Sequence, residues 1–268
     1  TLQSDFNKIP GNPTAYWVSN RLLEVFDENP SFEAVAPTRK GMVTARNHIY
    51  VRGWHEVSAV KSGIDQYKNR HLAISSQKKW FSYVKGGGFR KWYGNKTEVV
   101  NWENDGFDLQ TTKHPTEDRV WATNFNLDYI FKENVNWGAI TSSDFAARLS
   151  TGGELFDAGG SACFPKNVST LFILGFLNSA VTKASLSILN PTLNFQAGNI
   201  ANLPIIKELD TSIIQERIKK IVNISQIDWN AYERSWDFSV LPLIVEVSER
   251  NSTIESCYDT WILKNKKI

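Results

Sequence analysis

The chain is organised around one stretch, Lys85-Gly86-Gly87-Gly88-Phe89-Arg90-Lys91-Trp92-Tyr93-Gly94-Asn95. Its successive glycines permit backbone conformations closed to other residues, and they let a second backbone or a phosphate come close. Cationic side chains flank the glycines, and two aromatic residues follow directly. Glycine, positive charge and aromatic faces together suit contact with a nucleic-acid backbone. We therefore predict phosphate contacts for Lys85, Gly86, Gly87, Gly88, Arg90, Lys91, Trp92 and Tyr93.

The charges around this stretch are one-sided, although the whole chain has a formal charge of only +2. Residues 66–97 include no Asp or Glu, and their basic members are Lys68, Arg70, Lys78, Lys79, Lys85, Arg90, Lys91 and Lys96. Residues 98–133 are mainly acidic, and we expect them to face away from a polyanion. The alternative is a twisted β-hairpin whose basic side chains are merely solvated.

A second acid-free segment covers residues 34–55 and contains Arg39, Lys40, Arg46 and Arg52. Residues 38–41 are expected to form a loop before a β-prone segment at 47–54. This segment is either a solvated edge strand or a loop and strand presented to an anion.

Composition is that of an ordinary soluble globular protein, with 41% apolar and 22% charged residues among 268. Two cysteines without zinc spacing favour a reducing cytoplasm, and the four histidines form no metal-binding pattern. Residues 1–10 contain no secretory signal, and the apolar run 171–177 is too short to span a bilayer. We expect a cytoplasmic protein without a metal site or membrane contact.

Periodicity and turn signals predict an α+β fold, in which a twisted, mostly antiparallel sheet spans residues 39–164. An N-terminal helix should precede it, capped at Asn12 and ending near Asn29, and helices should follow it. Strands are predicted at 72–74, 80–84, 89–93, 98–102 and 136–141. One helical turn is predicted at 145–149, and longer helices are predicted at 168–189 and 212–228.

Motifs for catalysis are missing. The glycines match neither the dinucleotide-binding nor the phosphate-binding loop pattern. Both patterns need a strand-turn-helix setting, which this stretch lacks. Asn29-Pro30-Ser31-Phe32 and Asn190-Pro191-Thr192-Leu193 lack the second proline of the base-flipping loop of amino-methyltransferases. We predict no catalytic residues, although a nuclease-like pairing of acids stays open.

Further blocks are distinctive in combination with Lys85–Asn95. They are 9–17, 99–102, 104–106, 137–141 with Arg148, 156–161, 177–179 and 190–204. Together they resemble the C-terminal part of the PglX-type adenine-specific DNA methyltransferases of BREX phage-defence systems, and of related single-chain type II restriction-modification enzymes. The resemblance extends from residue 9 to about residue 204.

The resemblance implies a target-recognition portion without its methyltransferase portion. The S-adenosylmethionine loop and the catalytic loop of such proteins lie upstream of the matched part, so we expect no cofactor in this chain and S-adenosylmethionine in a parent protein. The implied divisions are an entry helix at 1–32, a DNA target-recognition domain at 33–206, and a helical spacer and tail at 207–268. The implied partners are double-stranded DNA and the upstream methyltransferase domain. Other defence-system subunits and a phage DNA-mimic inhibitor are further candidates.

Members of the resembled family read different DNA sequences yet share the Lys85–Asn95 block. Base reading is therefore assigned to the more individual segment, with Arg39, Lys40, Arg46 and Arg52 as candidates. Arg90 has an alternative role, since it could pair with an acid inside the fold. Three functions stay open at this point: a DNA recognition domain, an enzyme in its own right, and a protein-interaction domain of a defence complex.

Overall fold

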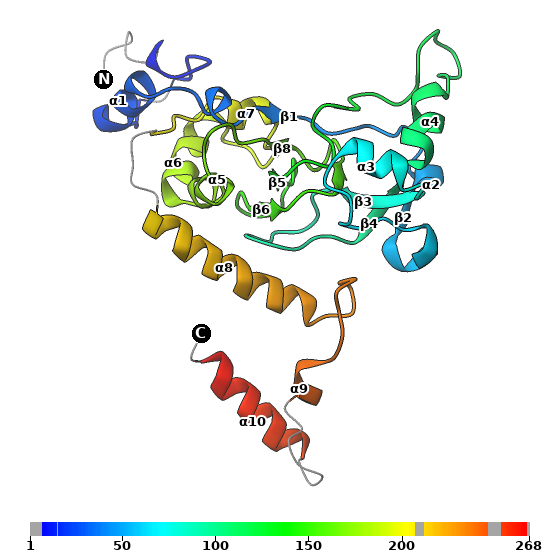
Figure 1. Ribbon diagram of the computed structural model, residues 1–268. Coiled ribbons are helices and arrows are strands. Elements are labelled where there is room, and N and C mark those ends of the chain that lie inside the picture. The colour runs from blue at the N-terminus through cyan, green and yellow to red at the C-terminus, as the bar shows by residue number, and fades with distance from the viewer. Residues whose placement is uncertain (1–6, 15, 207–211, 246–252, 267–268) are drawn as a thin grey trace.

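The computed structural model describes residues 7–14, 16–206, 212–245 and 253–266. The predicted α+β class is confirmed, but the strands form two four-stranded sheets where one was expected (Figure 1). The first sheet has the order β1 (Thr38–Arg39), β8 (Ala162–Cys163), β5 (Asn134–Trp137) and β6 (Ala147–Ser150). The second has the order β2 (Val51–Gly53), β4 (Glu98–Asn101), β3 (Trp80–Val84) and β7 (Glu154–Phe156). Every pair is antiparallel except β3 with β7.

The chain crosses between the sheets on both sides of β7, because β6 and β8 belong to the first sheet and β7 to the second. The first crossing uses Gly152 and Gly153, whose φ angles are +85° and +94°. A Cβ atom at Gly152 would lie 2.7 Å from the carbonyl oxygen of Phe131. Glycine is required there by both the backbone conformation and the close approach.

Ten helices, together with short 3₁₀ turns, are found in the described residues. They are α1 (Asn20–Glu28), α2 (Asn47–Tyr50), α3 (Arg70–Ser75), α4 (Glu103–Thr111), α5 (Thr170–Leu177), α6 (Ala180–Leu189), α7 (Ala197–Ala201), α8 (Ser212–Asn230), α9 (Pro242–Val245) and α10 (Ile254–Asn265). Each sheet has its own core. In the first, Val135 and Trp137 pack with Ile173 of α5 and Val222 of α8, whereas Phe81 of the second sheet packs in another cluster.

Several local predictions were wrong, each for a visible reason. Helix α1 begins after Ser19, whose Oγ accepts a hydrogen bond from the Leu22 amide, and ends before Asn29 as predicted. Residues 72–74 are helical because the Asn69 side chain caps α3. Residues 147–150 form a strand because they pair with β5. In addition, 89–93 is not a strand, so β3 and β4 form the hairpin around a long loop.

The helix predicted at 168–189 is broken into α5 and α6, which meet at an angle of 62°. The break lies at Asn178, whose side chain bonds both the amide (3.1 Å) and the carbonyl (3.0 Å) of Ala147 in β6. No single described helix is long and apolar enough to cross a bilayer, and only this bent pair reaches that composition.

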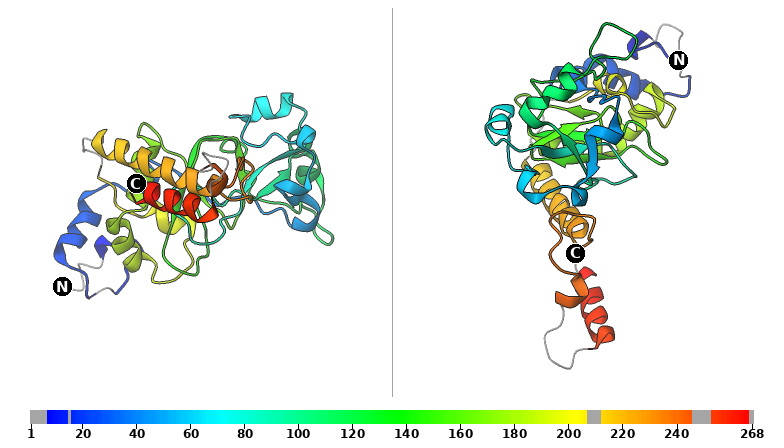
Figure 2. Two further views of the ribbon diagram at one scale, coloured as in Figure 1. Left: turned by 90° about the horizontal axis from the view of Figure 1, so that it is seen from below. Right: turned by 90° about the vertical axis from the view of Figure 1, so that its right-hand side faces the viewer.

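Helix α8 confirms the prediction at 212–228 and leads into a projecting arm. Figure 1 and the right-hand view of Figure 2 show α9 and α10 extending away from the two-sheet body. Helix α10 buries Cys257 and exposes Ile254, Tyr258 and Leu263. The helical spacer and tail expected at 207–268 lie partly outside the described residues.

Candidate nucleic-acid interface

The glycines of the central stretch differ in how closely other residues pack against them. Gly86 has a φ angle of +87°, and a Cβ atom there would lie 2.4 Å from the carbonyl oxygen of Gly159. A Cβ atom at Gly88 would meet nothing within 4 Å. The Asn95 amide donates to the carbonyls of Gly86 (3.0 Å) and Gly88 (2.7 Å) and so closes the loop. Gly86 is therefore needed for packing, whereas Gly88 leaves open space.

The corner made by residues 85–89 faces solvent with unused donors. Within the described residues, the backbone N–H groups of Gly87, Gly88 and Phe89 have no acceptor, and the Lys85 ammonium has no acidic partner. Gly87 and Gly88 are exposed, and Lys85 is half-buried. Backbone N–H groups and a lysine at an exposed corner are suited to bind an anion. We call residues 85–89 the open corner.

The remaining predicted phosphate ligands are occupied within the protein. Arg90 forms an ion pair with Asp228 (2.6 Å) and also donates to the carbonyls of Ser225 (3.1 Å) and Tyr93 (2.8 Å). The alternative role of Arg90, pairing with an acid inside the fold, is the arrangement found.

Lys91, Trp92 and Tyr93 are also engaged. The Lys91 ammonium donates to the carbonyl of Asn178 (3.3 Å), and Tyr93 is buried. Trp92 has a φ angle of +73°, and its backbone pairs with β6 through bonds to Ala147 and Leu149. These residues therefore fix the loop to the body.

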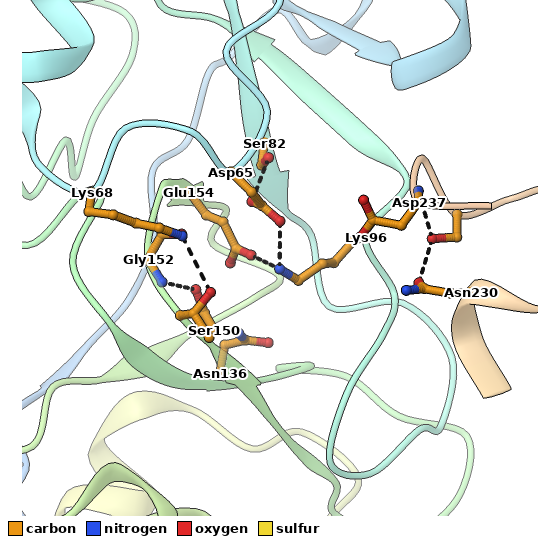
Figure 3. A network of polar contacts seen from close by, with 12 residues as sticks. Asp65, Lys68, Ser82, Lys96, Asn136, Ser150, Gly152, Glu154, Asn230 and Asp237 are labelled. Atoms are coloured by element: carbon orange, nitrogen blue, oxygen red, sulfur yellow. Dashed lines mark hydrogen bonds and ion pairs between the residues drawn. The ribbon is translucent and has the colours of Figure 1, made fainter. Parts of the chain in front are cut away.

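Lys96 lies at the centre of a buried polar cluster. Figure 3 shows its ammonium group between the carboxylates of Asp65 (3.1 Å) and Glu154, which forms the second ion pair. The exposed fractions of Lys96 and Glu154 are 6% and 1%. Burial would lower the pKa of Lys96, but Glu154 and Asp65 outweigh it, so the net pKa is raised and the ammonium stays charged. The sequence gives no local sign of this cluster.

Most of the basic residues at 66–97 have an ion-pair or hydrogen-bond partner within the protein. Arg70 pairs with Asp105, and Lys79 pairs with Glu103 at 3.0 Å. These acids belong to residues 98–133, so part of the acidic segment lies against the basic stretch. Lys68 and Lys78 donate to the carbonyls of Gly152 (2.8 Å) and Val60 (2.6 Å).

The base-reading candidates are also placed unequally. Arg39 is held by Glu33 (3.1 Å) and by the Tyr129 hydroxyl (2.7 Å). Lys40 is exposed, and Arg46 lies over the Trp121 ring at 5.7 Å. Arg52 donates to the carbonyls of His48 (2.8 Å) and Val51 (2.7 Å). In the part of the chain that the structure describes, Lys40, Arg46 and Arg52 have no acidic partner.

The structure brings the two basic segments to one turn, residues 157–160. On one side, Met42 donates to the carbonyl of Phe156 (2.8 Å) and accepts from Ala158 (3.0 Å). On the other side, the Asp157 amide donates to the carbonyl of Val84 (2.8 Å), and Gly86 packs on Gly159. The 157–160 turn therefore lies between the Lys40–Arg46 segment and the open corner and contacts both of them.

The Tyr83 hydroxyl ties this arrangement together, and sequence reasoning did not identify it. The hydroxyl donates to the carbonyl of Met42 (3.0 Å) and contacts the Asp157 carboxylate (2.9 Å). Burial and the nearby Asp157 charge raise the pKa of Tyr83 well above its usual value. Among the described residues, no group of three His, Cys, Asp or Glu side chains is placed to hold a metal ion.

Comparison with known proteins gives two strong similarities. The chain is 38% identical over 97% of its length to the adenine-specific methyltransferase PglX of Lacticaseibacillus casei. It is 37% identical over 91% of its length to the adenine-specific methyltransferase BrxX of Escherichia coli O9:H4. No protein-family model matches the chain. The chain spans only about a fifth of these relatives, 22% and 19% of their lengths. The resemblance read from the sequence motifs is therefore confirmed: nearly the whole chain is similar to one part of the PglX-type adenine-specific methyltransferases.

Proposed function

We propose that this chain is the DNA target-recognition part of a PglX-type adenine-specific methyltransferase. The open corner supports the proposal most directly, because in the described part of the chain Lys85 has no acidic partner and the neighbouring backbone N–H groups have no acceptor, where glycine admits close approach. Phosphate contacts of this kind fix the register of a protein on duplex DNA without reading its sequence. The similarity to adenine-specific methyltransferases supports DNA as the ligand.

Base reading falls to the other side of the 157–160 turn. Lys40 and Arg46 lie in the segment on that side, Arg52 lies in β2, and none of the three has an acidic partner in the described structure. An arginine that reaches O6 and N7 of guanine contributes about 1–3 kcal/mol of discrimination. Arg39 is held by Glu33 and Tyr129, so we assign it to support of the segment instead.

The rest of the PglX-type protein would supply the chemistry. We keep residues 33–206 as the recognition domain and 207–268 as the spacer, with S-adenosylmethionine bound by the methyltransferase domain outside this chain. Exposed apolar side chains on the arm, among them Ile244, Val245, Ile254 and Leu263, fit contact with that domain. They also favour the second candidate function, a protein-interaction domain for other defence subunits or a DNA-mimic inhibitor.

Duplex DNA binding should be weak and steeply dependent on salt, and Lys85→Ala should lower its salt slope by about one. The reason is the loss of one phosphate contact and its released counterion. Gel shifts or fluorescence anisotropy with random duplexes across a salt series measure both quantities. Lys220→Ala is the matched control, because Lys220 pairs with Glu216 on the surface of α8.

A salt-independent affinity for duplex DNA would contradict the proposal and favour the protein-interaction function. An equal loss of slope in Lys85→Ala and Lys220→Ala would contradict the assignment of the open corner.

A further inference from the structure

The loop that contains the open corner has a second side, which holds the end of helix α8. Arg90 reaches Asp228 and lies over the ring of Trp229 at 5.1 Å. Trp229 is buried, and a Cβ atom at Gly94 would lie 2.8 Å from its ring. Gly94 also has a φ angle of +118°, so the loop is shaped to receive this tryptophan.

The residues after α8 are held by the body as well. The Trp54 indole N–H donates to the carbonyl of Arg234 at 2.9 Å. The Lys96 ammonium, anchored by Asp65 and Glu154, lies 5.6 Å from the centre of the Trp236 ring. Body residues more than a hundred positions earlier in the sequence therefore grip both ends of residues 228–236.

Among its described residues, the arm adds few buried side chains beyond this grip. Ile218 and Val222 fix α8 itself, by packing on α5 in the core of the first sheet. Helix α9 has no buried residue, and α10 buries only Cys257. The direction of α9 and α10 relative to the body therefore depends on residues 228–236.

We infer that Trp54, Arg90 and Lys96 form a joint that sets the direction of the α9–α10 arm, and that Arg90 is a positioning residue rather than a DNA ligand. The inference rests on contacts within the chain and does not depend on the proposed function. The loop therefore has two roles: one side presents the open corner to solvent, and the other side positions the α9–α10 arm.

The direction of the arm can be measured by pulsed electron paramagnetic resonance on the full chain. Spin labels at Lys61→Cys on the body and Asp259→Cys on α10 report the distance across the joint; both positions are exposed, and both native cysteines are buried. Arg90→Ala combined with Trp54→Phe should at least double the width of the distance distribution. Lys220→Ala, on the solvent face of α8, should leave it unchanged.

Trp54→Phe alone keeps the test decisive if Arg90→Ala fails to fold, because it removes the indole N–H donor and part of one aromatic ring while leaving Arg90 in place. It should broaden the distribution by a smaller but measurable amount. Circular dichroism verifies folding of each variant. A folded double variant with an unchanged distance distribution would overturn the inference. A loss of DNA salt slope in Arg90→Ala as large as in Lys85→Ala, with the distance distribution unchanged, would return Arg90 to the DNA surface.

Discussion

Replacing Lys96 with methionine should lower the free energy of unfolding by about 3–5 kcal/mol. The substitution keeps most of the side-chain volume but removes the ion-pair partner of Glu154, whose exposed fraction is 1%. An uncompensated buried carboxylate has a large desolvation cost. Urea unfolding followed by tryptophan fluorescence measures the free energy of unfolding. Its dependence on urea concentration should be unchanged if the native state keeps its compactness.

The compensated variant Lys96→Met with Glu154→Leu is the control for this effect. Replacing both members of a buried ion pair by apolar residues is often close to neutral, so much of the stability should return. If the losses from the two substitutions simply add, burial of the charge is not the cause of the instability.

Gly41→Ala should destabilise the protein by roughly 3 kcal/mol, the upper part of the usual range for overpacking. A Cβ atom at Gly41 would lie 2.2 Å from the Asp157 carbonyl oxygen and 2.4 Å from that of Phe156. Both contacts are with backbone, which cannot move aside as a side chain would. The change should also separate the Lys40–Arg46 segment from the 157–160 turn. The melting temperature and the affinity for duplex DNA should therefore both decrease.

Gly198→Ala gives the opposite expectation at a glycine without contacts. A Cβ atom there would meet nothing within 4 Å, and residue 198 lies in helix α7. Alanine favours a helix over glycine by up to about 1 kcal/mol. Gly198→Ala should therefore leave the melting temperature unchanged or slightly raised, and a loss as large as that of Gly41→Ala would exclude backbone overlap as the explanation.

Elements with a strong local signal could be predicted from the sequence. Helix α8 carries clear periodicity, residues 80–84 are rich in strand-forming types although they alternate imperfectly, and both elements are found. The residue types of Asn104–Gly106 favour a turn, and the three φ angles there are all positive. Asn69 lies directly before Arg70–Ser75 and is a residue type that caps helices, but the apolar pattern of 72–74 favoured a strand.

What depends on distant partners could not be predicted. The break between α5 and α6 is fixed by the contact of Asn178 with Ala147, and no periodicity marks it. Residues 147–150 form a strand because β5 and the backbone of Trp92 offer partners. The same reason applies to the candidate site. Asp228 lies 138 positions from Arg90, so the basic stretch seemed freer than it is.

The most direct test of DNA recognition is a segment exchange. Residues 33–206 of this chain would replace the matching segment of the PglX protein of L. casei, and the methylated sites would be mapped by single-molecule sequencing in cells that carry the defence system. A second hybrid, carrying only residues 207–268, serves as the control. We predict that the first hybrid methylates adenine in a sequence different from that of the recipient, and that the control keeps the recipient's sequence. Methylation of the recipient's own sequence by the first hybrid would contradict the assignment of target recognition to this chain.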